Sequence, residues 1–190
     1  MKTLYISLKI FLAFTVLTGI IYPLFITGIA QVIFPAKANG SMIRRDNKII
    51  GSELIGQQFD SAIYFTSRPS VTLYNPLPSG GSNYGLTNIK LKELVSARKH
   101  VFYTFNQLDS LTPIPSEMLF ASGSGLDPHI SPEAALLQVD RIAAARNFTD
   151  MQKQKLLDCI KDFTESPQFL CLGEKRVNVL LLNLETDKIQ

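Results

Sequence analysis

The sequence predicts an α+β protein with one N-terminal transmembrane helix, followed by a single soluble domain of short strands and about three helices. Three observations lead to this prediction. Positions 10–36 carry no charged side chain, strand-like and helix-like patterns are segregated along the rest of the chain, and no low-complexity tract divides that rest. We therefore expect residues 1–36 to form the membrane segment and residues 37–190 to form one soluble domain.

The uncharged run from Ile10 to Ala36 is 27 residues long, whereas a bilayer core requires about 20. We expect the span at about residues 10–34, with Pro23 in its middle, where neighbouring turns satisfy the freed carbonyl. The alternative is a cleaved secretory signal, whose apolar core of about 7–15 residues is shorter than this run. The predicted anchoring side chains are Phe11, Leu12, Phe14, Val16, Leu17, Ile20, Ile21, Leu24, Phe25, Ile26 and Ile29.

Charge does not fix the orientation of this span, because basic residues flank both of its ends. Lys2 and Lys9 precede the span, and long domains translocate largely regardless of flanking charge. The basic residues that follow it are Lys37, Arg44, Arg45 and Lys48. Beyond residue 36 the chain holds 17 basic and 16 acidic side chains, and this near-neutral balance argues against nucleic acid as a partner.

The first part of the soluble domain is predicted to be rich in loops. Residues 48–59 read as short strands broken by Gly51 and Gly56. Residues 75–85 combine two prolines with three glycines, a density that excludes regular structure. We expect a long loop there.

Three helices are predicted next. Thr87 or Asn88 can cap an amphipathic helix that ends near Asn106, with an apolar stripe at Leu91, Leu94, Val95, Phe102 and Phe105. Ser131-Pro132-Glu133 is a strong signal for the start of a second helix, which we expect to end near residue 147. A capping box at Thr149 and Gln152 predicts the third.

The C-terminal apolar run from Val177 to Leu184 is branched and short, so we predict a core strand. Cys159 and Cys171 lie 12 positions apart without metal-type partners, and we expect two core thiols. A single bridge between them remains an alternative in an oxidising compartment.

The glycine- and serine-rich loop over residues 122–131 leads into a predicted helix N-terminus, where free N–H groups favour an anion or a partner's carboxylate. A tight turn is the alternative interpretation. Ser124, Asp127 and His129 contain the residue types of a hydrolase site, although no G-x-S-x-G motif surrounds the serine. Arg68 can bind a carboxylate, either of a ligand or of the domain itself.

Several segments together resemble the C subunit of the Kdp potassium-transporting ATPase, a bacterial potassium pump. The resemblance covers nearly the whole chain and is weakest after Asn147. Besides the apolar N-terminal span, it rests on these motifs: Gly51-Ser52-x-Leu54-Ile55-Gly56-Gln57-x-Phe59, Tyr64-Phe65-x-x-Arg68-Pro69-Ser70, Ser79-Gly80-Gly81-Ser82-Asn83, and Ser122-Gly123-Ser124-Gly125-Leu126-Asp127-Pro128-His129-Ile130-Ser131.

The resemblance implies a non-catalytic subunit that partners a channel-like potassium-binding subunit and a catalytic ATPase subunit in the bacterial inner membrane. It implies a catalytic chaperone that raises the ATP affinity of the pump, with no covalent cofactor, no metal, and ATP contacted at most through the complex. Gln138 lies where the family is proposed to contact nucleotide, and Arg141 shares its helix face. Other partner or ligand contacts are expected at Arg68, Ser79, Gly80, Gly81, Ser82, Asn83, Ser124, Gly125, Asp127 and His129.

The implied topology conflicts with direct ATP contact. The family places the amino terminus inside and the soluble domain outside, away from cytosolic ATP. One hypothesis is that the exterior domain caps the ion entrance of the channel subunit. The alternatives are a membrane-anchored hydrolase that uses Ser124 and His129, and an anchored receptor or adhesin.

Overall fold

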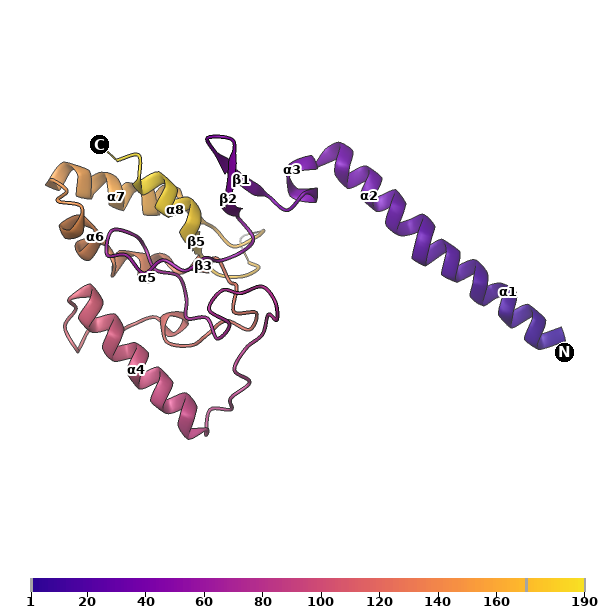
Figure 1. Ribbon diagram of the computed structural model, residues 1–190, viewed down its shortest axis with the longest axis horizontal. Coiled ribbons are helices and arrows are strands. Elements are labelled where there is room, and N and C mark those ends of the chain that lie inside the picture. The colour runs from indigo at the N-terminus through magenta and orange to yellow at the C-terminus, as the bar shows by residue number, and fades with distance from the viewer. Residues whose placement is uncertain (1, 170, 190) are drawn as a thin grey trace. The chain divides into compact units, whose positions relative to one another are not determined.

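The computed structural model describes residues 2–169 and 171–189, which divide into two compact units. The first unit runs through Ser52, and the second begins at Glu53 (Figure 1). The mixture of short strands with several helices confirms the predicted α+β class. The predicted boundary between residues 36 and 37 stays a prediction.

A long apolar helix begins the first unit. It consists of α1 (Lys2–Val16), the π-helical stretch η1 (Leu17–Ile21) and α2 (Tyr22–Ile33). Pro23 is the second residue after the π-helical stretch, so the wider turn accommodates the proline without ending the helix. None of the described side chains of this helix is buried. Its 32 residues are long and apolar enough to cross a membrane.

A short cap and a β-hairpin complete the first unit. The cap is α3 (Pro35–Ala38), and the hairpin pairs β1 (Met42–Arg45) with β2 (Lys48–Ser52) in antiparallel register. Asp46 and Asn47 form its two-residue turn, and both have positive φ, as a type I′ turn requires. The strand expected from Lys48 is therefore confirmed, but it runs through Gly51 without a break, and residues 53–59 form no strand, contrary to the prediction. The strand β1 was not predicted from the sequence.

The second unit holds a small antiparallel sheet surrounded by helices. The strand order is β3–β5–β4. Its elements are α4 (Ile89–Asn106), the 3-10 turn η2 (Ser116–Met118), β3 (His129–Ile130), α5 (Pro132–Leu136), α6 (Val139–Ala145), α7 (Asp150–Asp162), β4 (Thr164–Glu165), β5 (Arg176–Asn178) and α8 (Val179–Thr186). The core between them contains Phe65, Phe102, Met118, Ile130, Ile142, Leu156, Ile160, Val177 and Leu182.

The predicted helix starts are confirmed by their caps. The Asn88 side chain accepts a hydrogen bond from the Lys90 N–H at 2.8 Å, and Ser131 accepts one from Ala134 at 3.1 Å. Thr149 forms the predicted capping box that begins α7. The expected loop over residues 75–85 has no helix or strand.

Two of the predicted elements are wrong in part. The helix expected from residue 132 to about 147 breaks at Leu137 and Gln138 into α5 and α6. The run 177–184 is not a strand beyond Asn178, because α8 follows at once. Asn178 caps α8 by accepting a hydrogen bond from the Leu181 N–H at 3.2 Å. The buried side chains Val179, Leu182, Asn183 and Thr186 recur every three or four residues, as one face of a helix requires.

The expected burial was wrong for two side chains. Leu94, which belongs to the predicted stripe of α4, is 40% exposed. Cys159 packs against the core, but Cys171 is exposed, so the expectation of two core thiols holds for one of them. Both cysteines are free thiols.

Candidate functional site

Four loops far apart in the sequence meet in the second unit, and they carry most of the predicted contact residues. The Gly56 N–H donates to the Leu126 carbonyl at 2.8 Å, and the Gly80 N–H donates to the Ser124 carbonyl at 3.1 Å. The Ser67 hydroxyl donates to the carbonyl of Gln57 at 2.9 Å. We call this meeting of residues 56–57, 67–74, 80–81 and 122–129 the loop junction.

Two glycines allow the loops of the junction to approach one another. A Cβ at Gly56 would lie 2.6 Å from the Asp127 carbonyl oxygen. Gly125 has a φ of +71°, and a Cβ there would lie 2.7 Å from the Thr72 hydroxyl oxygen. Only glycine combines this backbone conformation with so close a contact. The glycine-rich motifs therefore serve to pack loop against loop.

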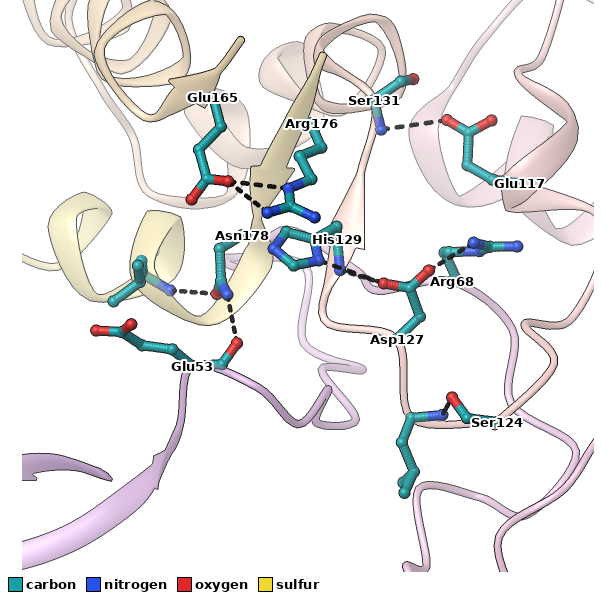
Figure 2. A network of polar contacts seen from close by, with 12 residues as sticks. Glu53, Arg68, Glu117, Ser124, Asp127, His129, Ser131, Glu165, Arg176 and Asn178 are labelled. Carbon is teal, nitrogen blue, oxygen red and sulfur yellow. Dashed lines mark hydrogen bonds and ion pairs between the residues drawn. The ribbon is translucent and has the colours of Figure 1, made fainter. Parts of the chain in front are cut away.

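An ion pair links two of these loops. Arg68 donates to the Asp127 carboxylate at 2.6 Å, and Asp127 also accepts from the backbone N–H of His129 at 3.0 Å (Figure 2). The His129 Nδ1 lies 3.4 Å from the same carboxylate. Burial by itself raises the pKa of Asp127, but the bonds from His129 and the Arg68 charge outweigh it and lower the pKa to about 2. Asp127 is therefore ionised at neutral pH and already paired within the chain.

Tyr74 forms two hydrogen bonds within the loop that carries Arg68. Its hydroxyl donates to the Arg68 carbonyl, and its N–H donates to the Ser70 hydroxyl at 3.0 Å. Burial raises the pKa of Tyr74 to about 12. The phenol therefore stays protonated as a hydrogen-bond donor.

The hydrolase alternative requires Ser124 beside His129, and the structure does not bring these two side chains together. The Ser124 hydroxyl accepts from the Leu126 N–H at 3.1 Å, and His129 faces Asp127 instead (Figure 2). Among the hydrogen bonds of the described residues, none joins Ser124 to His129. Ser79, Ser82 and Asn83 lie in the same irregular loop, and Ser79 and Asn83 are exposed.

The N-terminus of α5, where an anion was expected, already has a carboxylate from this chain beside it. The Ser131 N–H donates to Glu117 at 3.2 Å, and the Ser131 hydroxyl caps the helix (Figure 2). The acid comes from η2, 14 residues earlier in the sequence. A carboxylate is thus the local ligand, and it is not a partner's.

Gln138 lies on the buried side of the domain. Its side chain is fully buried, and its Oε1 accepts from the Thr66 N–H at 2.7 Å and from the Thr66 hydroxyl at 2.9 Å. Its Nε2 donates to the Ala134 carbonyl at 3.2 Å and to the Thr66 carbonyl at 3.4 Å. Both ends of the amide are therefore bonded within the chain.

Arg141 extends the same buried cluster. Its guanidinium donates to the carbonyls of Ala62 and Tyr64, to Gln138 Oε1 at 2.9 Å and to Asn106 Oδ1 at 2.9 Å. It also stacks on the Phe105 ring, with 4.4 Å between Cζ and the ring centroid. Burial lowers the pKa of Arg141 to about 10, which still leaves it charged at neutral pH.

These side chains hold residues 62–66, a turn that continues into irregular chain and belongs to no helix or strand. Asn183 brackets Phe65, because it accepts from the Phe65 N–H at 2.7 Å and donates to the Phe65 carbonyl at 2.9 Å. Arg146 donates to the Ile63 carbonyl at 2.8 Å. Asn183 was not predicted as a contact residue, although an amide in the middle of the leucine-rich part of the run 177–184 was the available signal.

A cavity of about 480 Å³ lies beside the loop junction, between α4 and the chain from 58 to 74. Its lining is mainly apolar and includes Leu94, Val101, Phe105, Leu73 and Tyr74. Arg68 also lines it, so the cavity and the loop junction share that residue. An apolar side chain of another protein would fit such a surface.

Comparisons with known proteins give one consistent result. The family model described as "K+-transporting ATPase, c chain" matches residues 4–188. A potassium-transporting ATPase KdpC subunit from Pectobacterium atrosepticum is 47% identical, over 99% of this chain and 97% of that protein. The KdpC subunit of Methylococcus capsulatus is 44% identical over 97% and 96%, and that of Mycobacterium bovis is 45% identical over 96% of each.

Proposed function

Because the chain belongs to the KdpC family, the c chain of the K+-transporting ATPase, we propose that it is a non-catalytic accessory subunit of an ATP-driven potassium uptake pump. Its partners are then a channel-like potassium-binding subunit and a catalytic ATPase subunit. The chain supports assembly of the pump and acts as a catalytic chaperone that raises its affinity for ATP.

The burial of Gln138 and Arg141 is the main observation on how the chain affects ATP affinity. Both side chains are bonded to the chain's own backbone and side chains, and direct contact with ATP would require those bonds to break. Each buried donor or acceptor left without a partner costs about 1–3 kcal/mol. We therefore propose that the effect on ATP affinity is indirect and passes through contacts between subunits.

The proposed topology agrees with an indirect effect. The apolar helix spans the bacterial inner membrane with the amino terminus inside, and the second unit lies outside, where it caps the ion entrance of the channel-like subunit. The loop junction and the adjacent apolar cavity are the contact surface we propose for that subunit. ATP then reaches only the catalytic subunit, on the other side of the membrane.

The test compares three pump preparations: with the full chain, with a chain that ends after Ser52, and without the chain. We expect the truncated chain to weaken co-purification of the larger subunits and to change the potassium and ATP concentrations at half-maximal ATPase rate. The proposal would be overturned if neither the potassium nor the ATP concentration at half-maximal rate changed.

The orientation has its own test. Single cysteines at Ser41 and Leu184, in a chain whose Cys159 and Cys171 are replaced by serine, are exposed to an impermeant thiol reagent on intact cells. Labelling before lysis supports an exterior domain. Labelling only after lysis would place the domain in the cytosol and reopen direct ATP contact.

A further inference from the structure

The strongest concentration of positive charge outside the loop junction lies in the first unit, directly after the apolar helix. Residues 34–52 hold four basic side chains and one acid, Asp46, a net charge of +3. The second unit holds thirteen basic and fifteen acidic side chains, a net charge of −2. The positive excess of the soluble part therefore resides in this short stretch.

The structure displays these charges on the surface of the hairpin. Arg44 on β1 and Lys48 on β2 are exposed, and Lys37 on α3 is exposed as well. The type I′ turn at 46–47 brings the two strands into register, so Arg45 lies opposite Lys48 and Arg44 opposite Ile49. The apolar side chains Met42 and Ile49 are half exposed beside them (52% and 55%).

Specific hydrogen bonds hold the short connection between the helix and the hairpin. The Asn39 amide donates to Gln31 of α2 at 3.2 Å and to the Pro35 carbonyl at 2.7 Å. At the base of the hairpin, the Ser52 hydroxyl donates to the Gly40 carbonyl at 2.6 Å. The basic hairpin therefore follows the helix terminus after a short, hydrogen-bonded connection that contains α3 (Figure 1).

The helix terminus sets the level of the hairpin relative to a bilayer. A 32-residue helix is about 48 Å long, whereas the hydrocarbon core is about 30 Å thick and headgroups add about 5–8 Å on each side. Lys37 follows the last helical residue of α2 by four positions. The hairpin thus lies within reach of the headgroup layer, where exposed arginine and lysine meet lipid phosphates.

We propose that α3 and the β1–β2 hairpin form a binding surface for the headgroups of anionic phospholipids, with Lys37, Arg44 and Lys48 as the phosphate-binding side chains and Met42 and Ile49 resting at the interface. Bound headgroups hold the hairpin against the membrane and so restrict rotation and tilt of the helix. The interaction applies on either side of a membrane whose leaflets both contain anionic lipid.

The test reconstitutes the full chain, with Cys159 and Cys171 replaced by serine and a fluorophore on Met42→Cys, into phosphatidylcholine vesicles. Quenching by a headgroup-spin-labelled phosphatidylglycerol is compared with quenching by the equivalent phosphatidylcholine. We expect the anionic lipid to be enriched near the hairpin, and the enrichment to disappear in about 1 M salt, where the Debye length is about 3 Å. Each basic residue removed should lower the enrichment by about fivefold.

The key variant combines Lys37→Gln, Arg44→Gln and Lys48→Gln. Its matched control combines Lys90→Gln, Lys92→Gln and Lys175→Gln, which removes the same charge from exposed positions of the second unit. Lys37→Arg with Arg44→Lys keeps the charge and should keep the enrichment even if the hairpin packs slightly differently.

Equal quenching by the two lipids in the parent chain would overturn the proposal, and so would equal losses in the key variant and its control. If the parent chain shows no enrichment while the key variant fails to co-purify with the larger pump subunits, the basic hairpin binds an acidic protein surface instead.

Discussion

Arg68 and Asp127 form a 2.6 Å ion pair across 59 positions of the sequence, and this pair joins two of the motifs by which the chain resembles its family. Both side chains are about three-quarters buried. The same carboxylate accepts from His129, so it links a third point of the loop junction.

The first prediction concerns Asp127→Asn. The folded-state pKa of about 2 lies below the usual 3.8, so the ionised carboxylate stabilises the fold above about pH 4 and loses this contribution as the pH falls towards 2. We expect the variant to lose about 2 kcal/mol of unfolding free energy at pH 7. Denaturant unfolding of the full chain in detergent micelles measures this loss at each pH.

The difference between the two chains should shrink between pH 4 and 2. Asp162→Asn is the control, because it removes a carboxylate from an exposed position. A loss that is independent of pH would mean that Asp127 acts through its shape and not through its charge.

The second prediction concerns Gln138→Met, which keeps the side-chain length and removes the amide. The Thr66 N–H and the Arg141 guanidinium lose an acceptor, so we expect a loss of about 2–4 kcal/mol of unfolding free energy. The ATP affinity of the assembled pump should decrease only under conditions in which part of the variant domain is unfolded.

The exposed Gln154→Met should leave both quantities nearly unchanged. If Gln138→Met weakens ATP binding while the domain keeps its full stability, the amide contacts the nucleotide directly and the indirect mechanism is wrong.

The third prediction compares two glycines of one loop. Gly125→Ala introduces a Cβ at a φ of +71° and 2.7 Å from the Thr72 hydroxyl, so we expect a loss of more than about 2 kcal/mol. Gly123→Ala meets no atom within 4 Å and should cost less than about 1 kcal/mol. Thermal unfolding of the two variants side by side measures the contrast, and equal losses would contradict the packing role of Gly125.

The fourth prediction concerns Asn178→Val. If residues 177–184 formed one strand, a β-branched residue at 178 would be neutral or favourable, but Asn178 ends β5, caps α8 and donates to the Glu53 carbonyl at 2.8 Å. We expect the variant to lose about 1–2 kcal/mol of unfolding free energy. A gain in stability would favour the strand.

The sequence predicts those parts of the fold that local chemistry determines. Asn88, Ser131 and Thr149 cap helices through bonds to residues two or three positions ahead, and all three were predicted. The run 177–184 was ambiguous, because an apolar stretch of eight residues fits a buried strand or a buried helix. The helix forms because Leu182, Asn183 and Thr186 then share one buried face.

The candidate site was predicted as a set of residues but not as an arrangement. Gln138 was singled out together with Arg141 on one helix face, yet the backbone groups that they bond, in Thr66, Ala62 and Tyr64, lie 72–79 positions earlier in the chain. Local pattern cannot show whether such donors face solvent or a distant backbone. The pairing of Arg68 with an acid of the domain was one of two alternatives, and only the structure identifies Asp127 as that acid.

Residues 62–66 occupy a single register against the side chains of Arg141, Arg146 and Asn183 that bond their backbone. A strand in a ladder can slip by two residues and recover equivalent bonds. A slip of residues 62–66 would bring equivalent backbone groups to Arg141 and Asn183, but it would take Phe65 out of the core and the Thr66 hydroxyl away from Gln138. The burial of Phe65 and the bond from Thr66 to Gln138 thus fix one register, and in that register Arg68 lies 2.6 Å from Asp127.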